Sequence, residues 1–157
     1  MPSRKPPSFD LEKMLSYRVS MLFGRLSVGT SRQLVGSFDL ALREWRVLAL
    51  LAKLEPVSAT ALVARSPLDK ASVSRAVANL TERDLVVAKP SDEDRRAQTL
   101  ALTAEGRRLF HKIAPLSVER ERLLLEGFSE SERKALFRSL DKLIERSGEL
   151  LATNGDD

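Results

Sequence analysis

The segment over residues 69–83 carries side chains that could contact base pairs and phosphates. As a helix with about 100° per residue, it has an apolar side and an opposite side whose residues are small and polar. The polar side holds Ser72, Arg75, Ala78 and Asn79. An Arg guanidinium can donate two parallel hydrogen bonds to guanine, and an Asn amide can pair with adenine. Lys70, Ser72 and Ser74 suit phosphate contacts, which set the register of a complex but read no sequence.

The elements before this segment decide how its polar face is interpreted. Taken alone, such a face fits an ordinary solvated helix equally well, because Ser, Arg and Asn are common on protein surfaces. A short helix over residues 59–65, capped by the hydroxyl of Ser58, comes first. A turn at residues 66–68 then leads to a second helix that Asp69 can cap. This is the order of a helix-turn-helix, whose second helix enters the major groove.

A charged hairpin is predicted immediately after that helix. Strands are expected over residues 85–89 and 97–102, with Leu100 and Leu102 on one face. The tip between them is made of charged residues: Asp92, Glu93, Asp94, Arg95 and Arg96. Because acids repel phosphate, we expect Asp94 to pair with one arginine and hold the tip in shape. The other arginine then points into the minor groove, where narrow A·T stretches concentrate negative potential; a self-paired, solvated loop is the alternative.

Amphipathic helices flank this region on both sides. The apolar spacing predicts a long helix over residues 9–34 and a second helix over residues 43–54. Another helix begins at Thr103, and Pro115 should bend or break it. A last helix opens with a capping box at residues 129–132. The apolar stripes of the first and last helices are too long for a lone copy to bury easily, which favours a dimer interface over an intrachain core.

Composition excludes several kinds of site. The chain has 157 residues, 43% of them hydrophobic, which is enough for one folded domain. It has no cysteine, so disulfides and thiolate sites are excluded, and its one histidine, His111, makes a metal site improbable. We find no nucleophile supported by a histidine and no Gly-rich phosphate loop before a helix. We therefore expect no metal, no cofactor and no enzymatic activity.

Net charge and hydropathy indicate the expected partner and the expected cellular location of the chain. The net charge of +4 is a weak sign of a polyanionic partner. Residues 58–102 carry 7 basic and 6 acidic residues, so the argument for nucleic acid depends on where the charges lie. No apolar run approaches the ~20 residues that span a bilayer, and the start of the chain does not read as a secretory signal. We expect a cytoplasmic protein with no membrane partner and a disordered arm over residues 1–8.

Five motifs in the same order and spacing resemble the MarR family of winged helix-turn-helix transcription regulators. They are Trp45-Arg46-Val47-Leu48, residues 68–75 (LDKASVSR), residues 80–86 (LTERDLV), residues 92–96 (DEDRR) and residues 102–106 (LTAEG). The close match covers residues 40–108, and the flanking helices agree in placement and length only.

The resemblance implies a fold that is mainly α-helical with a small β-hairpin wing. It implies a winged helix-turn-helix DNA-binding lobe over residues 40–103 and a helical dimerisation region made of residues 9–36 and 104–152. Two intertwined copies would place two lobes on a pseudo-palindromic operator in double-stranded DNA. Many members of the family also respond to a small phenolic or aromatic effector, bound between the dimer helices and the DNA lobe.

Residue roles carried over from the family match the positions singled out above. Ser72, Ser74, Arg75 and Asn79 would face the major groove. Arg96 would enter the minor groove, with Asp94 and Arg95 shaping the tip. The chain departs from the family at three positions: Asp84 stands where Gly is usual, Pro67 lies in a turn that commonly contains Gly, and Ala41 replaces a hydroxyl cap. Asp84 is expected in a left-handed conformation, which Asp tolerates better than most residues.

The chain also offers candidate residues for an effector pocket. An aromatic acid needs an apolar slot and a cation or hydroxyl, which Tyr17, Arg18, Met21 and Trp45 could supply. A plain core role for Trp45 and a surface role for Arg18 are the alternatives. For the whole chain we expect a ligand-responsive regulator, a repressor that binds its operator as a homodimer. The alternative is a winged-helix architectural or protein-interaction module without an effector.

Overall fold

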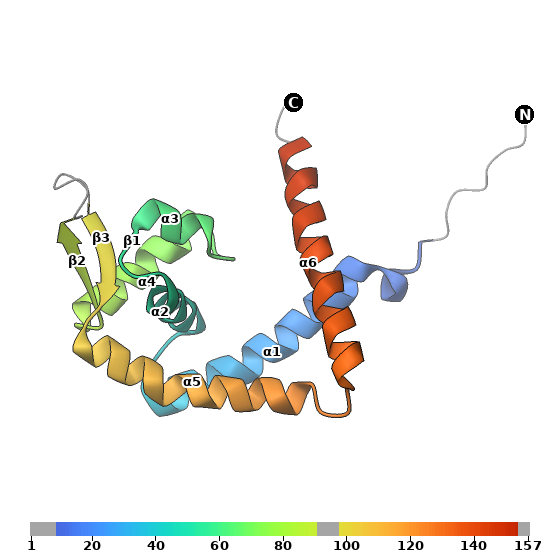
Figure 1. The fold of residues 1–157 in the computed structure, drawn as a ribbon, viewed down its shortest axis with the longest axis horizontal. Coiled ribbons are helices and arrows are strands. Elements are labelled where there is room, and N and C mark those ends of the chain that lie inside the picture. The colour runs from blue at the N-terminus through green and yellow to red at the C-terminus, as the bar shows by residue number, and fades with distance from the viewer. Residues whose placement is uncertain (1–8, 91–97, 154–157) are drawn as a thin grey trace, which may run out of the picture. The chain divides into compact units, whose positions relative to one another are not determined.

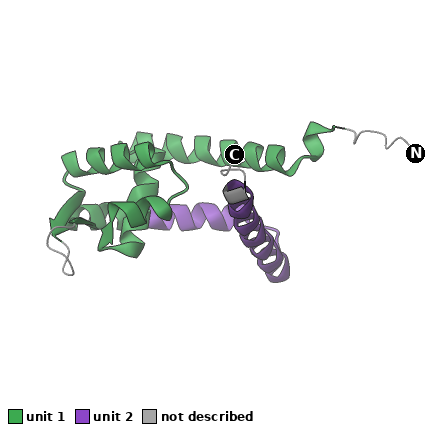
Figure 2. Ribbon diagram, turned by 90° about the horizontal axis from the view of Figure 1, so that it is seen from above, with its two compact units in different colours: residues 1–111 green, residues 112–157 purple. Residues whose placement is uncertain are grey.

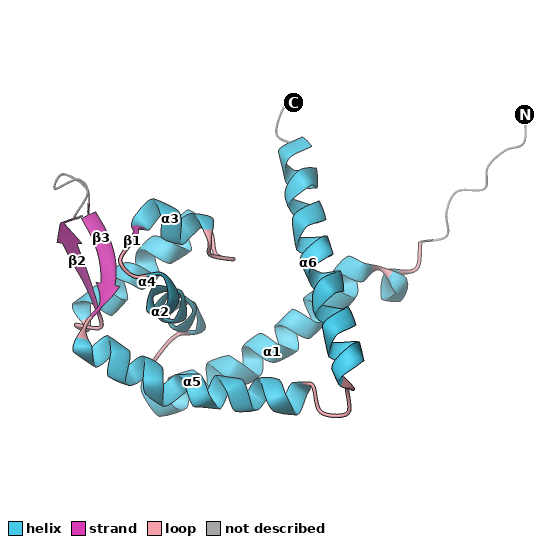
Figure 3. Cartoon of the chain, in the orientation of Figure 1, coloured by secondary structure: helices cyan, strands magenta, loops and turns pink. Residues whose placement is uncertain are grey.

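Helices form most of the chain in the computed structural model, which describes residues 9–90 and 98–153 (Figure 1, Figure 3). The elements are a 3-10 turn η1 (Leu11–Lys13), α1 (Leu15–Phe38), α2 (Leu42–Leu54), β1 (Val57–Ser58), α3 (Ala59–Ala64), α4 (Lys70–Glu82), β2 (Val86–Pro90), β3 (Gln98–Leu102), α5 (Ala104–Leu124) and α6 (Glu130–Thr153). The chain divides into two compact units, residues 1–111 and 112–157, and α5 belongs partly to each (Figure 2). The predicted fold class, mainly helical with a small antiparallel sheet, is confirmed.

The core of the first unit is built from α2, α3, α4 and the sheet. Its buried helical side chains recur at the spacing of one helix face: Val47, Leu48 and Leu51 on α2, and Val73, Ala76 and Leu80 on α4. This confirms the apolar side that the sequence predicted for the second helix of the helix-turn-helix. The opposite side of α4 is therefore left outside the core.

The sheet has three antiparallel strands in the order β1-β3-β2. Val57 pairs with Leu100 on one side of β3, and Val86 pairs with Leu102 on the other. Leu100 and Leu102 lie on one face as predicted, and Ala101 on the opposite face is buried as well. Strand β1 was not predicted, because two residues are too few to show an alternating pattern.

The first helix differs from its predicted bounds at both ends. Instead of one helix from residue 9, the chain makes the η1 turn and then an extended residue, Met14, before α1 begins. At the other end α1 continues to Phe38, where Asp39 takes a left-handed conformation with φ 48°. The N–H of Leu40 bonds to the carbonyl of Leu34, and the Leu40 side chain is fully buried. These contacts close the helix and turn the chain into α2.

The helix after the hairpin starts as predicted but is not broken by its proline. The Thr103 hydroxyl accepts a hydrogen bond from the N–H of Gly106 at 3.0 Å and so caps α5. The helix then runs through Pro115 to Leu124. Proline removes a single backbone N–H, and the turns on either side keep theirs, so the helix is continuous. Of the two outcomes expected at Pro115, the break is wrong and the bend stays a prediction.

In the second unit, α6 begins at the predicted capping box. The N–H of Ser129 donates to the carboxylate of Glu132 at 2.8 Å, and the N–H of Glu132 donates to the Ser129 hydroxyl at 3.3 Å. Arg133 fixes the preceding loop by donating to the carbonyl of Leu125 at 2.9 Å. None of the helices in residues 9–90 and 98–153 has the length and apolar content needed to cross a membrane.

Candidate nucleic-acid interface

The start of α4 is fixed by side chains that precede it. Ser66 accepts a hydrogen bond from the N–H of Leu68 at 3.0 Å and shapes the turn after α3. Asp69 Oδ1 then accepts from the N–H of Ser72 at 2.8 Å and caps α4, as predicted. Ser58 likewise caps α3 by accepting from the N–H of Ala61 at 3.2 Å. The helix-turn-helix is thus assembled from two capped helices and one hydrogen-bonded turn.

A chain of hydrogen bonds runs along the outer side of α4. The Ser72 hydroxyl donates to Asp69 Oδ2 at 2.7 Å and accepts from Arg75 Nη2 at 3.2 Å. The side-chain and backbone hydrogen bonds from Ser72 lower the pKa of Asp69 below its ordinary value of 3.8. Asp69 is therefore ionised at neutral pH and orients Arg75 through Ser72. The Arg75 side chain is exposed and lies along the helix face predicted to meet DNA.

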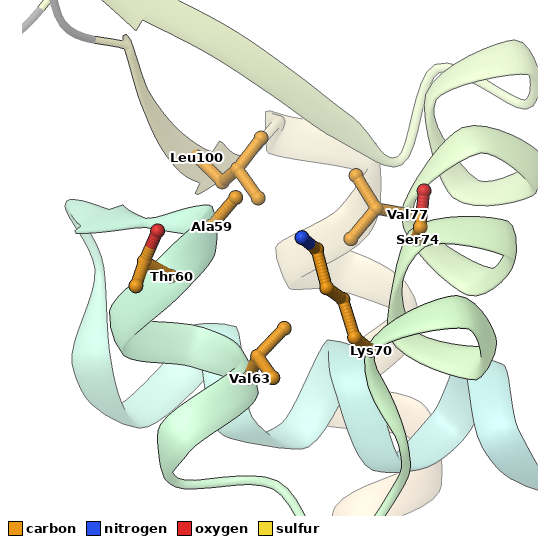
Figure 4. A pocket seen from close by; sticks show the side chains of 7 residues that line it. All are labelled: Ala59, Thr60, Val63, Lys70, Ser74, Val77 and Leu100. Atoms are coloured by element: carbon orange, nitrogen blue, oxygen red, sulfur yellow. The ribbon is translucent and has the colours of Figure 1, made fainter.

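Lys70 and Ser74 lie together at the edge of a cavity of about 320 Å³. Its lining comes from three elements: Ala59, Thr60 and Val63 of α3, Lys70, Ser74 and Val77 of α4, and Leu100 of β3. Figure 4 shows the Lys70 side chain reaching across this space with its amine toward the interior. Both residues are exposed, as phosphate contacts must be.

Asn79 is predicted to read a base, but its side chain forms a hydrogen bond within the first unit. Its amide donates to Glu44 Oε1 on α2 at 2.9 Å, and the residue is half-buried. Glu44 itself is buried, and its other oxygen accepts from the N–H of Ala41 at 2.9 Å. This is the carboxylate half of a capping box, in which the N3 side chain accepts from the N-cap N–H; Ala41 has no hydroxyl to supply the other half. Sequence reasoning missed Glu44, although an acid three and four residues before the buried Val47 and Leu48 was a signal that could have been read.

The end of α4 confirms the backbone expected at Asp84. Asp84 has φ 53°, in the left-handed region, and the N–H of Leu85 bonds to the carbonyl of Leu80 at 2.9 Å. The Thr103 hydroxyl donates to the carbonyl of Asp84 at 2.6 Å. Gly106 comes so close to this turn that a Cβ added there would lie 2.1 Å from the Leu85 carbonyl oxygen.

The base of the hairpin is held by an ion pair. Glu55, at the end of α2, accepts from the N–H of Leu102 at 2.5 Å and pairs with Arg107. Arg107 also donates to the carbonyl of Leu102 at 3.1 Å. The predicted tip residues Asp94, Arg95 and Arg96 lie outside the described residues, as do Asp92 and Glu93.

Three of the four predicted effector-binding residues come together. Tyr17, Arg18 and Met21 line a hollow of about 430 Å³ on α1, which Glu12, Leu22 and Arg25 complete. Arg18 donates from Nε to the carbonyl of Glu12 at 2.9 Å. Trp45 is not part of this hollow: its ring stacks on Phe110 of α5, with centroids 5.9 Å apart.

The chain is similar to several known proteins. A sequence model described as "MarR family" matches residues 38–97. The HTH-type transcriptional repressor YetL of Bacillus subtilis (strain 168) is 27% identical over 140 residues, 88% of this chain and 77% of that protein. The structure of a MarR/EmrR family transcriptional regulator from Acinetobacter sp. ADP1 has a TM-score of 0.84 and 29% identity, over 90% of this chain and 99% of that one. CouR from Rhodococcus jostii RHA1, bound to p-coumaroyl-CoA, has a TM-score of 0.76 and 26% identity, over 87% and 95%.

Proposed function

Because this chain belongs to the MarR family of winged helix-turn-helix transcription regulators, we propose that it binds double-stranded DNA as a homodimer and represses transcription from a pseudo-palindromic operator. The observation that carries this proposal is the arrangement of α4. A capped helix follows a capped helix and a turn, and it keeps its apolar side in the core while Lys70, Ser74 and Arg75 stay exposed. A regulator of genomic DNA acts where that DNA is, which in bacteria is the cytoplasm.

We assign separate roles to the side chains of α4. Arg75 is proposed to read a base edge, because its guanidinium is exposed and already oriented by Ser72. Lys70 and Ser74 are proposed to contact phosphates and set the register. Ser72 is left out of this set, because its only O–H is donated to Asp69 and its role is to orient Arg75. Asn79 is left out of the base-reading set, since its amide is bonded to Glu44. Asp94, Arg95 and Arg96 remain proposed wing residues, with Arg96 in the minor groove.

The homodimer is supported by apolar surface that one copy leaves exposed. On α1, Leu15, Val19 and Leu22 are about half exposed, and on α6 Ile144 and Leu151 are more exposed still. Rows of large apolar side chains on both terminal helices are unfavourable in water and favour association. We propose that residues 9–36 and 104–152 form the dimerisation region and that residues 40–103 form the DNA-binding lobe.

A small aromatic or phenolic effector is the second part of the proposal. The hollow beside Tyr17, Arg18 and Met21 offers an apolar wall, a hydroxyl and a guanidinium, which suit an aromatic acid. CouR, a relative of 26% identity, is bound to an aromatic acyl thioester. Trp45 is left out of the proposed pocket because its ring already packs on Phe110. The proposal assigns no enzymatic step to the chain.

Selection from a random pool of duplexes tests the proposal. The full-length protein should enrich two inverted half-sites about one helical turn apart, on the order of 34 Å. Affinity for the enriched duplex should fall steeply as salt rises and should exceed affinity for random DNA by about a thousandfold or more. A protein that enriches no paired site would instead be an architectural or protein-interaction module. An effector is then sought by adding p-coumarate and related aromatic acids and measuring release from the selected duplex.

A further inference from the structure

We propose that Glu44 and Arg83 are positioning residues for DNA binding, because they join the recognition helix α4 to the corner between α1 and α2. We call Glu44, Asn79, Arg83 and the carbonyls of residues 38 and 39 the α1–α4 junction. The inference rests on the proposed function, since it concerns how a dimer presents two α4 helices to one operator.

Glu44 is the buried centre of the junction. Its side chain is 8% exposed, and its oxygens accept from the N–H of Ala41 and from the amide of Asn79, each at 2.9 Å. A carboxylate in such a place is unfavourable unless it is hydrogen-bonded and paired with a cation. Arg83 supplies the cation, with Nη1 3.8 Å from Glu44 Oε2. Both carboxylate oxygens thus hold α4 and the start of α2 together.

Arg83 connects the same site to the end of α1. Its Nη1 donates to the carbonyl of Asp39 at 2.6 Å and its Nη2 to the carbonyl of Phe38 at 3.4 Å. The last carbonyls of a helix have no partner within the helix, and a cation is favoured at that end. The guanidinium of Arg83, the C-cap residue of α4, therefore caps α1, the helix that we assign to the dimer interface.

The two contacts lie at different points along the chain of α4, so together they fix the direction of the helix axis. Asn79 lies in the last turn of α4 and Arg83 is the C-cap residue four positions later, and both reach the α1–α2 corner. Two attachments along one helix restrain its direction, whereas one attachment would leave it free to pivot. On its other side, the carbonyl of Asp84 is held by the Thr103 hydroxyl at the start of α5. A shift of α1 in the dimer is therefore passed to α4.

The test compares two duplexes that the wild-type full-length protein selects, one with both half-sites and one with a single half-site. The ratio of the two affinities reports how well the pair of α4 helices fits the spacing. A loss of folded protein lowers both affinities equally and leaves the ratio unchanged. Arg83→Gln should lower the ratio about tenfold, the effect of losing charge-assisted hydrogen bonds, while single half-site affinity stays close to that of the wild type.

Two further variants make the result specific. Lys53→Gln removes a positive charge from an exposed residue of α2 that we place neither on the DNA-contacting side of α4 nor in the dimerisation region, and it should leave the ratio unchanged. Arg83→Lys keeps a cation at the end of α1 but lacks the fork that donates to both carbonyls, so it should give an intermediate ratio. Because lysine is the milder change, it also serves if Arg83→Gln fails to fold.

The outcomes separate this inference from the function on which it rests. If the wild type itself shows no preference for the paired duplex, the dimeric operator is refuted. The proposed role of the junction is then refuted as well. If the wild type prefers the paired duplex and both Arg83 variants keep the full ratio, the junction is only structural and the inference alone is overturned. Glu44→Gln combined with Arg83→Gln should lower the ratio by less than the product of the single effects, because both act on one junction.

Discussion

The side-chain amide of Asn79 lies 2.9 Å from the buried carboxylate of Glu44 and donates a hydrogen bond to it. The two residues are 35 positions apart in the sequence, and their contact joins α4 to α2. This bond engages one of the two N–H donors of the amide and holds the amide toward α2. Asn79 therefore differs from Arg75, which lies on the same helix with an exposed side chain.

Asn79→Ala should lower stability without changing base preference. The substitution removes a donor from Glu44 and leaves one oxygen of a buried carboxylate without that partner, at a cost of about 1–3 kcal/mol. Urea unfolding measures the loss, and sequencing of selected duplexes measures the preference at each position. A variant of normal stability with relaxed preference for adenine would return Asn79 to the base-reading set.

Arg75→Ala should relax base preference at one position of each half-site. A bidentate contact from arginine to guanine discriminates against the wrong base by about 1–3 kcal/mol, and alanine cannot replace it. The selected sequences should lose a single preferred base while their spacing stays unchanged. Equal loss of affinity for every sequence would show that Arg75 contacts phosphate only.

Lys70→Ala is the matched comparison on the same helix. A phosphate contact carries no sequence information, so affinity should fall by a similar factor for all duplexes. The slope of log affinity against log salt should become shallower by about one unit. A changed base preference in this variant would mean that Lys70 reads sequence.

Asp69 should make stability depend on pH in the acid range. The pKa of Asp69 is lowered in the folded protein because the Ser72 hydroxyl and then the Ser72 N–H donate to its carboxylate. A group with a depressed folded-state pKa contributes stability above its ordinary value of 3.8. That contribution is lost as pH falls through the lower folded-state value.

The Asp69→Asn variant isolates this effect from other carboxylates. Asparagine is also a good N-cap but does not titrate, so the variant should lose less stability than the wild type as pH falls below about 4. Urea unfolding at a series of pH values gives the difference. Parallel curves for the two proteins would mean that Asp69 has the same pKa in the folded and unfolded chain.

Local chemistry explains which parts of the fold could be predicted. Asp69 caps α4 and Ser129 caps α6 through neighbours three residues away, so both were visible in the sequence. The left-handed conformation of Asp84 follows from its place directly after the helix. The apolar spacing likewise marked the buried side of α4. Each of these features depends on residues within one or two turns.

Contacts between distant segments explain what was missed. The partner of Asn79 is on another helix, so helical periodicity alone assigned its amide to the outer face. The end of α1 is set by Leu40, which the core buries, and by Arg83 at the end of α4, and neither contact is local. The break at Met14 has no such signal, because the apolar spacing continues across it.

Leu22→Glu should convert the dimer to monomers. Leu22 is 52% exposed on α1 in a single copy, and a carboxylate buried in an apolar interface is unfavourable. Sedimentation of the full-length chain measures its mass in solution. Ala88→Glu places the same side chain at an exposed position of strand β2, outside the proposed dimerisation region, and should stay dimeric. A Leu22→Glu protein that sediments as a dimer would remove this face of α1 from the interface.

Gly106→Ala should destabilise the DNA-binding lobe strongly. A Cβ at Gly106 would lie 2.1 Å from the carbonyl oxygen of Leu85, a backbone atom that cannot rotate away. The same oxygen accepts from the N–H of Thr103 at 3.1 Å, so any displacement also disturbs the start of α5. We expect a loss of about 3 kcal/mol, at the upper end for overpacked sites.

Gly24→Ala is the control, because it makes the same chemical change on α1. A Cβ there meets no atom within 4 Å, and alanine is favoured over glycine inside a helix by about 1 kcal/mol. Thermal unfolding should therefore move in opposite directions for the two variants. If Gly106→Ala unfolded at the wild-type temperature, the close packing of α5 against the turn after α4 would be wrong.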